Sequence, residues 1–572
     1  MTGKVLGALM LTAGLCAFAQ EASANAEEMK ELWARARALE ELLEQVEFTD
    51  VQKTPAVDQG PQMRTARMHP NKQAKTQGRR LDEDPPYTTN VLDTLFLLIC
   101  GALVMFMQAG FAILEAGSVT SKNSGTVLLK NLMDVCLGSL CWYFLGYGIA
   151  YGTRDDDTNT FMGTKNFAAG GFFDGFDAGY DDIPSFLDWF FQWAFCSAAA
   201  TIVSGGVAER MAFPAYIFYS IWMTAFIYPV VVYWTWSGSG WLTIGSGKIA
   251  LDDAGKIFFE KKADGYSDFA GSGIVHLVGG IGALTGAILL GPRKDRFVNP
   301  DAFKPSNPHL CVLGTLILWF GWYGFNCGSQ LTLNSQGDIW ATTMVAMNST
   351  LAAAGGGTIV FFTRLIVSII KGKMEYDICG MCNGLLAGLV AICCGVNVIE
   401  PSWALVTGIL GGLFMELGHY FCLMLKIDDP LDAFAVHGMG GLCGLLTRPI
   451  FDYTGSKDTM FGWNVLGFFA ISAWVIANSA LVMVPLKICK KLRVPTEEES
   501  KGGDAFLSHS PVKKIYEALP AKKEDAPPVV EVVDVRPVAE SEQTGVNTKD
   551  ITQETNATAA AAAEEPEENV EI

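Results

Sequence analysis

Long apolar segments, separated by short polar ones, restrict this chain to a helical membrane fold. They fill most of the sequence between residues 91 and 486, and charged residues make up only 18% of the chain. A helix needs about 20 mostly apolar residues to cross a bilayer, whereas soluble domains contain roughly 25% charged residues. The pattern therefore predicts an all-α membrane protein and excludes a soluble one.

The apolar segments divide into eleven predicted transmembrane helices. Their expected bounds are 91–117, 127–151, 186–207, 215–236, 271–290, 311–328, 339–367, 380–395, 404–425, 433–450 and 466–486. Basic residues follow the fifth, seventh and eleventh segments, and Lys/Arg in short loops marks the cytoplasmic side. This predicts an N-terminus outside and a C-terminus in the cytoplasm, in the cell (plasma) membrane.

The two ends of the chain are polar and predict separate regions. Residues 1–25 resemble a secretory signal peptide, with an uncleaved signal anchor as the alternative. Residues 26–90 predict an extracellular helix and linker, and residues 91–494 predict the membrane domain. Residues 495–572 hold 18 Asp/Glu against 7 Lys/Arg, which predicts an acidic, largely disordered cytoplasmic tail. The chain's net charge of −19 argues against nucleic acid as a partner.

Cysteines give no sign of a metal or cofactor site. Most of the 14 lie inside apolar segments, where thiols act as small hydrophobes. Cys379 and Cys382 form a single CxxC without a second CxxC or a histidine pair at zinc spacing. No metal and no cofactor are predicted.

Three of the six histidines lie inside predicted helices, and two of them follow an aspartate. His419, in the ninth segment and without a matching motif, is predicted to be a packing residue. His276 follows Asp268, and His437 follows Asp432. An ionisable ring in a bilayer is costly and normally faces a cavity or a partner; the alternative is that each ring packs and hydrogen-bonds a neighbouring backbone. Both aspartates are predicted helix N-caps. Two such pairs, five segments apart, predict inverted repeats and favour a shared polar path.

Five ordered motifs resemble the ammonium transporter (Amt/Mep/Rh) family. They are MQAGF at 107–111, AERM at 208–211, DFAGSGIVH at 268–276, GWYGFNCGS at 321–329 and DAFAVHG at 432–438. The resemblance covers about residues 91–494. It implies eleven transmembrane helices, a pseudo-two-fold 5+5 inverted repeat plus one extra helix, and a homotrimer with one pore per subunit, embedded in membrane lipid.

The resemblance also implies roles for particular residues. Phe195 and Phe325 correspond to a gate of stacked rings, and His276 and His437 to twin pore histidines. Trp236, Ser329 and Phe195 correspond to an outer ammonium site, with Trp241 as the second choice for the tryptophan. Asp268 corresponds to an essential aspartate that holds backbone geometry and favours a cation outside.

The expected activity is transport of ammonium, which loses its proton near the gate so that ammonia passes the histidines, with the proton as a possible co-transferred partner. No bond other than N–H changes, so the protein is not predicted to be an enzyme. Trp236 and Ser329 favour the Amt branch over an Rh-type neutral gas channel. An ammonium sensor that signals through its tail is the other alternative. The family's tail motif is matched poorly, by GGDAFLSHS at 502–510, which puts tail coupling between subunits in doubt.

Overall fold

A computed structural model describes residues 86–152, 159–172, 185–244, 248–251, 257–260, 265–454 and 458–507. The predicted signal peptide and the extracellular helix before residue 86 lie outside the described residues, as does the tail after residue 507.

The described chain is helical apart from one antiparallel hairpin of two short strands. The elements are α3 (Pro86–Ser118), η1 (Ser121–Asn123), α4 (Ser124–Cys141), η2 (Trp142–Gly146), α5 (Tyr147–Tyr151), η3 (Phe167–Ala169), α6 (Ser185–Val207), α7 (Phe213–Trp222), η4 (Met223–Ile227), α8 (Tyr228–Thr235), α9 (Trp241–Ile244), β1 (Lys248–Leu251), β2 (Ile257–Glu260), η5 (Ser272–Leu277), α10 (Val278–Leu290), η6 (Pro300–Phe303), α11 (Pro308–Gly328), α12 (Gln336–Ile370), α13 (Ile378–Ile392), α14 (Pro401–Met424), η7 (Phe434–Met439), α15 (Gly440–Phe451), α16 (Asp458–Ile488), α17 (Thr496–Lys501) and η8 (Gly503–Phe506).

The predicted all-α membrane fold is confirmed. Within the described residues, nine helices are long and apolar enough to cross a membrane. Two further predicted spans coincide with shorter helical segments, α13 and the continuous turn-helix pair η7–α15. Eleven crossings therefore remain a prediction, with a helical segment at each predicted place.

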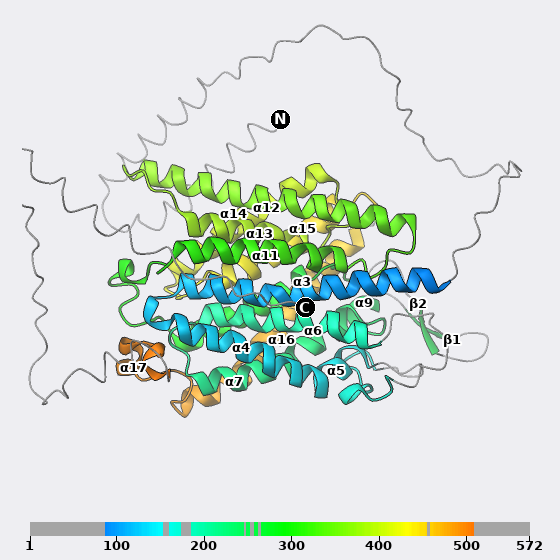
Figure 1. Cartoon of the computed structure of the whole chain (residues 1–572), viewed down its shortest axis with the longest axis horizontal. Coiled ribbons are helices and arrows are strands. Elements are labelled where there is room, and N and C mark those ends of the chain that lie inside the picture. The colour runs from blue at the N-terminus through cyan, green and yellow to red at the C-terminus, as the bar shows by residue number, and fades with distance from the viewer. Residues whose placement is uncertain are drawn as a thin grey trace, which may run out of the picture. The chain divides into compact units, whose positions relative to one another are not determined.

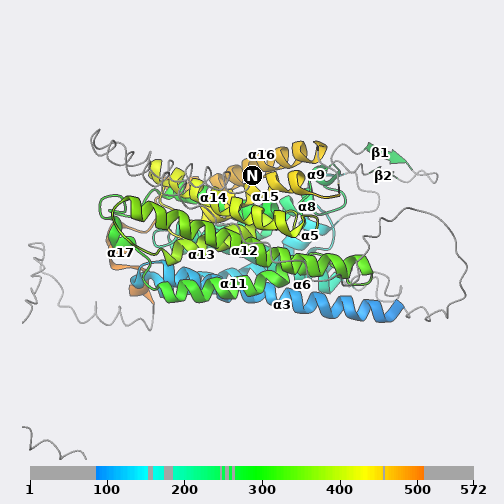
Figure 2. The ribbon, with the colours of Figure 1, turned by 90° about the horizontal axis from the view of Figure 1, so that it is seen from above.

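The helices run side by side in a bundle (Figures 1 and 2), and small residues allow their closest contacts. Helix α3 lies along α11. At their crossing, a Cβ atom on Gly314 would lie 2.5 Å from the backbone nitrogen of Leu114, and one on Gly110 would lie 3.0 Å from that of Leu318. Lipid tails are as apolar as leucine, so helices in a membrane associate through such close packing rather than through the hydrophobic effect.

Apolar side chains cover the outside of the bundle as well as its interior. Phe218, Trp340 and Phe469 are 64%, 71% and 63% exposed in the single chain. A soluble protein rarely presents so much apolar surface, whereas a membrane protein turns it toward lipid or toward another subunit.

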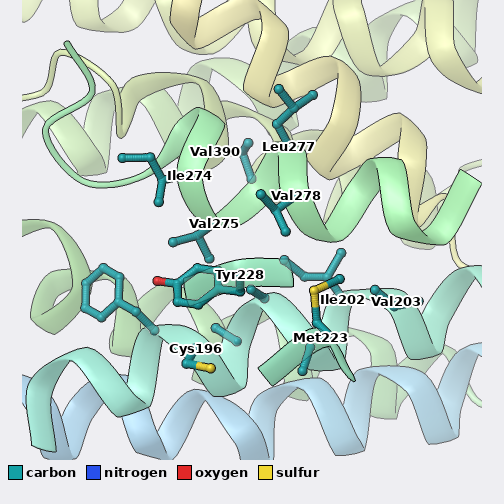
Figure 3. Close-up of a cluster of buried hydrophobic side chains, with 14 of the residues drawn as sticks. Cys196, Ile202, Val203, Met223, Tyr228, Ile274, Val275, Leu277, Val278 and Val390 are labelled. Carbon is teal, nitrogen blue, oxygen red and sulfur yellow. The ribbon is translucent and has the colours of Figure 1, made fainter. Parts of the chain in front are cut away.

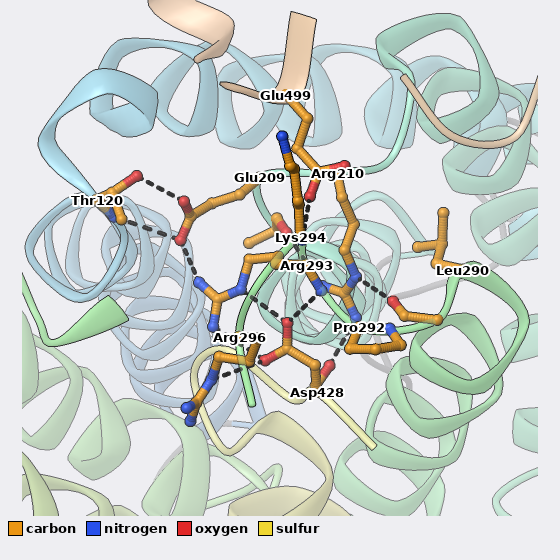
Figure 4. Close-up of polar contacts among 12 residues, drawn as sticks. Thr120, Glu209, Arg210, Leu290, Pro292, Arg293, Lys294, Arg296, Asp428 and Glu499 are labelled. Carbon is orange, nitrogen blue, oxygen red and sulfur yellow. Dashed lines mark hydrogen bonds and ion pairs between the residues drawn. The ribbon is translucent and has the colours of Figure 1, made fainter. Parts of the chain in front are cut away.

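One end of the bundle carries a network of arginines and carboxylates (Figure 4). We call it the arginine-rich end, after Arg210, Arg293, Arg296 and Arg493. Arg293 is hydrogen-bonded to both oxygens of Asp428 and also pairs with Glu209. Arg210 donates to the main-chain oxygens of Gly291 and Asp428. These bonds tie together the loops that follow α6, α10 and α14.

The first residues after α16 belong to the same end of the bundle. Arg493 forms an ion pair with Glu499 of α17, whose other oxygen accepts from the backbone nitrogen of Lys294. Asp504 accepts hydrogen bonds from the backbone nitrogens of Gly125 and Thr126, at 3.0 and 2.7 Å. A carboxylate suits this position because the first backbone N–H groups of α4 have no partner within the helix. Residues 496–506 thus form ordered structure on their own chain's helices.

Asp428 is expected to be the main stabilising group of this end. Burial would raise the pKa of its carboxyl, but the hydrogen bonds and charge of Arg293 outweigh burial and lower it from 3.8 to about 2. A lowered folded-state pKa stabilises the fold at pH above the ordinary value, and this contribution is lost as the pH falls through about 2. We predict that Asp428→Asn costs about 3 kcal/mol of stability at neutral pH, because a buried partner of Arg293 is lost.

Thermal unfolding of the solubilised protein measures this cost as a lower midpoint. The control is Asp301→Asn, which removes the exposed ion pair with Lys304 and should leave the midpoint unchanged. Equal midpoints for wild type and Asp428→Asn would contradict the assigned role.

Candidate functional site

Two phenylalanines from different helices form a stacked pair inside the bundle. The rings of Phe195 on α6 and Phe325 on α11 are 4.1 Å apart between centroids, with an interplanar angle of 24°. Both side chains are fully buried, at 1% and 0% exposure. Rings in this contact leave no space between them, as the predicted gate of stacked rings requires.

An aromatic and a hydroxyl lie beside this pair, toward the end opposite the arginines. The indole of Trp236, at the end of α8, meets Phe195 edge-on at 5.9 Å, and its Nε1–H donates to the main-chain oxygen of Asp268 at 2.8 Å. Ser329, at the end of α11, donates its hydroxyl to the main-chain oxygen of Phe325 at 2.8 Å. Both side chains are only half-buried. The indole N–H and the serine O–H are therefore occupied, while the indole face and the serine lone pairs are left for a ligand.

The alternative tryptophan, Trp241, has a different environment. Its ring lies 5.7 Å from that of Trp234, and its backbone nitrogen bonds to Thr160. Trp236 is the one that contacts Phe195.

Asp268 fastens the start of the fifth predicted span. Its carboxylate accepts four backbone N–H bonds, from residues 271 to 274, at 2.7 to 3.1 Å. The hydroxyl of Tyr266 donates a fifth at 3.1 Å. The predicted N-cap role is thus observed, in a more extensive form than one cap bond. Because Trp236 bonds to its main-chain oxygen, Asp268 also fixes the indole.

The two histidines lie next to each other below the phenylalanines. The His276 ring stacks on Phe325 at 5.4 Å and on the His437 ring at 5.3 Å, and the two Nδ1 atoms are 3.2 Å apart. Such a contact requires one Nδ1 to carry hydrogen and the other to accept it. In the neutral pair, one Nε2 then carries hydrogen while the other has a lone pair, and Nε2 of His276 lies 3.8 Å from Sγ of Cys393. The histidine pair therefore has a hydrogen-bond donor on one Nε2 and an acceptor on the other.

Both histidines lie on π-helical turns, His276 on η5 and His437 on η7. A π turn inserts an extra residue into a helix, and such turns are frequent at functional sites. Apolar side chains of α6, η4 and α13 enclose η5, among them Ile202, Met223 and Val390 (Figure 3). Because this packing leaves little freedom, the His276 ring is held in place.

The second aspartate prediction was wrong about which residue caps the helix. Asp429, rather than Asp432, accepts from the backbone nitrogens of Ala433 and Phe434, at 3.0 and 2.8 Å. Asp429 precedes His437 by eight residues, as Asp268 precedes His276, so these two aspartates are the matching pair of the predicted repeats. The Asp432 carboxylate instead contacts Nδ1 of His419 at 2.7 Å. His419, predicted to be a packing residue, is thus a hydrogen-bond partner of Asp432.

Two rings that line the histidines were not predicted. Trp322 stacks on His276 at 5.3 Å, and Phe111 lies 6.2 Å from His437. Both occur in the five ordered motifs, but a motif does not say which of its aromatic residues turns inward. Among the described residues, no group of three or more His, Cys, Asp and Glu is arranged to hold a metal ion.

Trp236, Phe195, Phe325, His276 and His437 thus form a continuous file of rings through a bundle of membrane helices. The file has a half-exposed polar end, a closed aromatic constriction and a paired-imidazole interior. This arrangement defines a channel-like membrane transporter with a narrow internal pathway.

Comparison with known proteins names the family. The model of the Ammonium Transporter Family matches residues 95–510. An ammonium transporter 1 member 3 of Solanum lycopersicum is 35% identical, over 73% of this chain and 92% of that protein. The ammonium transporter Amt1 of Haloferax mediterranei is 39% identical, over 74% and 80%. A solved structure described as a sensor Amt protein aligns with a TM-score of 0.62 at 32% identity, covering 73% of this chain and 98% of that one. The chain belongs to the ammonium transporter family, whose members are not enzymes.

We predict that Trp236→Leu weakens the apparent ammonium affinity, by up to roughly 30-fold if the full cation–π energy of about 2 kcal/mol is lost. Uptake measured against ammonium concentration gives the affinity, and competition with methylammonium gives the selectivity. Trp241→Leu is the matched control and should change neither. An unchanged affinity in Trp236→Leu together with a loss in Trp241→Leu would move the site to Trp241.

Proposed function

We propose that the chain is an ammonium transporter of the Amt branch, which takes up ammonium at Trp236, Ser329 and Phe195 and conducts ammonia past His276 and His437. The observation that carries this proposal is the order of the rings, from an open indole through a stacked gate to a buried imidazole pair.

The chemistry of the open end favours ammonium over other small cations. The faces of Trp236 and Phe195 attract a cation, and the lone pairs of Ser329 accept one N–H. Ammonium has four N–H donors, whereas potassium has none and recovers less of its hydration here. Cation–π attraction of about 2 kcal/mol in a desolvated place supports recruitment.

Below the gate, the pathway suits a neutral molecule. The rings of Phe325, Trp322 and Phe111 line it together with the two imidazoles, and a narrow apolar pore excludes ions. Ammonium therefore gives up its proton near the gate when Phe195 and Phe325 part. The N–H bond breaks, an imidazole nitrogen receives the proton, and ammonia hydrogen-bonds to the histidine pair as it passes.

The membrane setting is part of the same proposal. The chain assembles as a homotrimer in the plasma membrane, with lipid around it, its N-terminus outside and its C-terminus in the cytoplasm. The arginine-rich end is then cytoplasmic, which agrees with the preference of Lys and Arg for cytoplasmic loops. Trp236 and Ser329 open to the outside.

Two other functions are weaker. An Rh-type neutral gas channel has no use for a cation site, so Trp236 and Ser329 argue against it. A sensor is supported by the likeness to the sensor Amt protein and by the docking of Glu499 and Asp504 on the helices. Within the residues described, however, the segment after α16 contributes only α17 and η8, which are too short to form a signalling domain.

Expression in cells that lack their own ammonium uptake tests the function. We predict rescue of growth on limiting ammonium, together with an inward current in voltage-clamped membranes if the proton also crosses. Rescue without current indicates electroneutral passage. Absence of rescue, with the protein folded and at the cell surface, would support the sensor instead.

The double change His276→Leu/His437→Leu tests the pore. Loss of the paired nitrogens should abolish ammonia-specific flux or admit other cations, because no group then accepts the proton or hydrogen-bonds the passing molecule. Flux of ammonium and potassium into proteoliposomes distinguishes the two results. His309→Leu, at an exposed histidine, serves as control, and wild-type flux in the double variant would remove the histidines from the mechanism.

A further inference from the structure

A buried glutamate outside the file of rings shares a small cavity with the second pore histidine. The cavity has a volume of about 30 Å³, and Glu115 of α3 and His437 of η7 both line it, with Asn383 and Gly205. One water molecule occupies about this volume in the liquid. The imidazole and the carboxylate supply the polar partners that such a water needs.

The Glu115 carboxylate is only partly satisfied by protein groups. One of its oxygens, Oε2, accepts from the hydroxyl of Ser204 at 2.8 Å and from the amide of Asn131 at 3.3 Å. The residue is only 2% exposed, and both of these hydrogen bonds fall on Oε2. Because Glu115 lines the cavity, Oε1 is the oxygen left for a cavity water.

Two charged residues of α4, Lys130 and Asp134, belong to the surroundings of Glu115. Lys130 is 2% exposed, lies over the ring of Tyr216 at 5.2 Å and is attracted by Glu115 and Asp134. Asp134 is already held by the hydroxyls of Tyr216 and Ser220 from α7. Both oxygens of Asp134 are thus occupied, so Glu115 is the carboxylate that can exchange a proton with the cavity beside His437.

Lys130 also reaches a second, wider pocket. This pocket, of about 640 Å³, lies at the arginine-rich end and is lined by Lys130, Glu209, Lys490 and Arg493. Lys490 is exposed. Glu115 thus lines the cavity beside His437, while Lys130 of α4, the helix that carries its hydrogen-bond partner Asn131, lines the pocket beside Lys490.

We propose that Glu115 is a proton-relay residue, which takes the proton released by ammonium from His437 and delivers it to the pocket beside Lys130, apart from the path of ammonia. This inference rests on the proposed function. It requires that the proton crosses as well as ammonia.

The steps balance without any further reactant. Ammonium loses a proton to the histidine pair and becomes ammonia. His437 passes the proton through the cavity water to Oε1 of Glu115, which becomes a neutral acid. The acid then releases the proton to water in the wider pocket, helped by the positive charge of Lys130, and the carboxylate is restored. Ammonia leaves by the pore and is protonated again in the cytoplasm.

The test compares charge movement with neutral flux in proteoliposomes that contain the full chain. Ammonium-evoked current is recorded on a solid-supported membrane, and ammonia entry in alkaline buffer is followed by an encapsulated pH indicator, with protein-free vesicles subtracted. We expect Glu115→Gln to lower the current at least tenfold and leave ammonia entry within twofold of wild type. Glu115→Asp keeps an acid and should recover part of the current.

Two further variants keep the result decisive. Glu416→Gln alters another buried glutamate, which lies on α14, pairs with Arg364 of α12 and does not line the cavity beside His437. It should leave both signals unchanged. Glu115→Gln/Lys130→Met removes the unpaired cation if the single variant folds poorly, and should show the same split. Wild-type current in either Glu115→Gln variant overturns the relay. Equal loss of both signals in both variants also overturns it, because the carboxylate would then only hold the pore together.

Failure of the proposed function gives a different outcome. Wild-type chain with neither current nor ammonia entry contradicts ammonium transport itself. Wild-type chain with ammonia entry and no current retains transport and overturns the relay, since there is no proton to carry.

Discussion

The need to give every polar group in the bilayer a partner governs this structure. Backbone groups meet it through helices, because no water is available to them in hydrocarbon. Side chains meet it through local bonds: Asp268 collects four backbone N–H groups, and Asp134 takes two hydroxyls. A buried polar atom without a protein partner costs stability unless a ligand or a water occupies it, and among the described residues such atoms include Nε2 of Gln108 and the hydroxyl of Tyr228.

The pathway is built from residues that satisfy themselves without using their ligand-facing surfaces. Trp236 and Ser329 donate their own hydrogens to main-chain oxygens. The indole face of Trp236 and the lone pairs of the Ser329 hydroxyl remain available, and both suit a cation with N–H donors. His276 and His437 contact each other through their Nδ1 atoms, so in the neutral pair one Nε2 carries a hydrogen and the other a lone pair. Polar side chains are stable inside the membrane because their own donors are hydrogen-bonded within the protein.

The sequence was most informative about residue types and their order. It predicted that Phe195, Phe325, His276 and His437 belong together, and they do lie in contact. It failed where the outcome depends on backbone detail. Asp432 was predicted to be an N-cap, but its backbone is left-handed (φ 56°) and its side chain contacts His419, while Asp429 takes the capping role. The sequence analysis also did not predict the π turns η5 and η7. One extra residue in a helix does not visibly change the pattern of apolar residues.

The sequence by itself determined the membrane fold and the chemical groups available to the pathway. Length and hydropathy decide whether a segment crosses a bilayer, and the motifs fix which rings and carboxylates exist. The tertiary structure decided which groups meet. Stacking of Phe195 on Phe325, the shared hydrogen between His276 and His437, and the cavity that joins His437 to Glu115 each require helices far apart in the chain to pack within a few ångströms. That distance depends on small residues such as Gly314 and on side-chain packing in three dimensions, which periodicity along one chain does not encode.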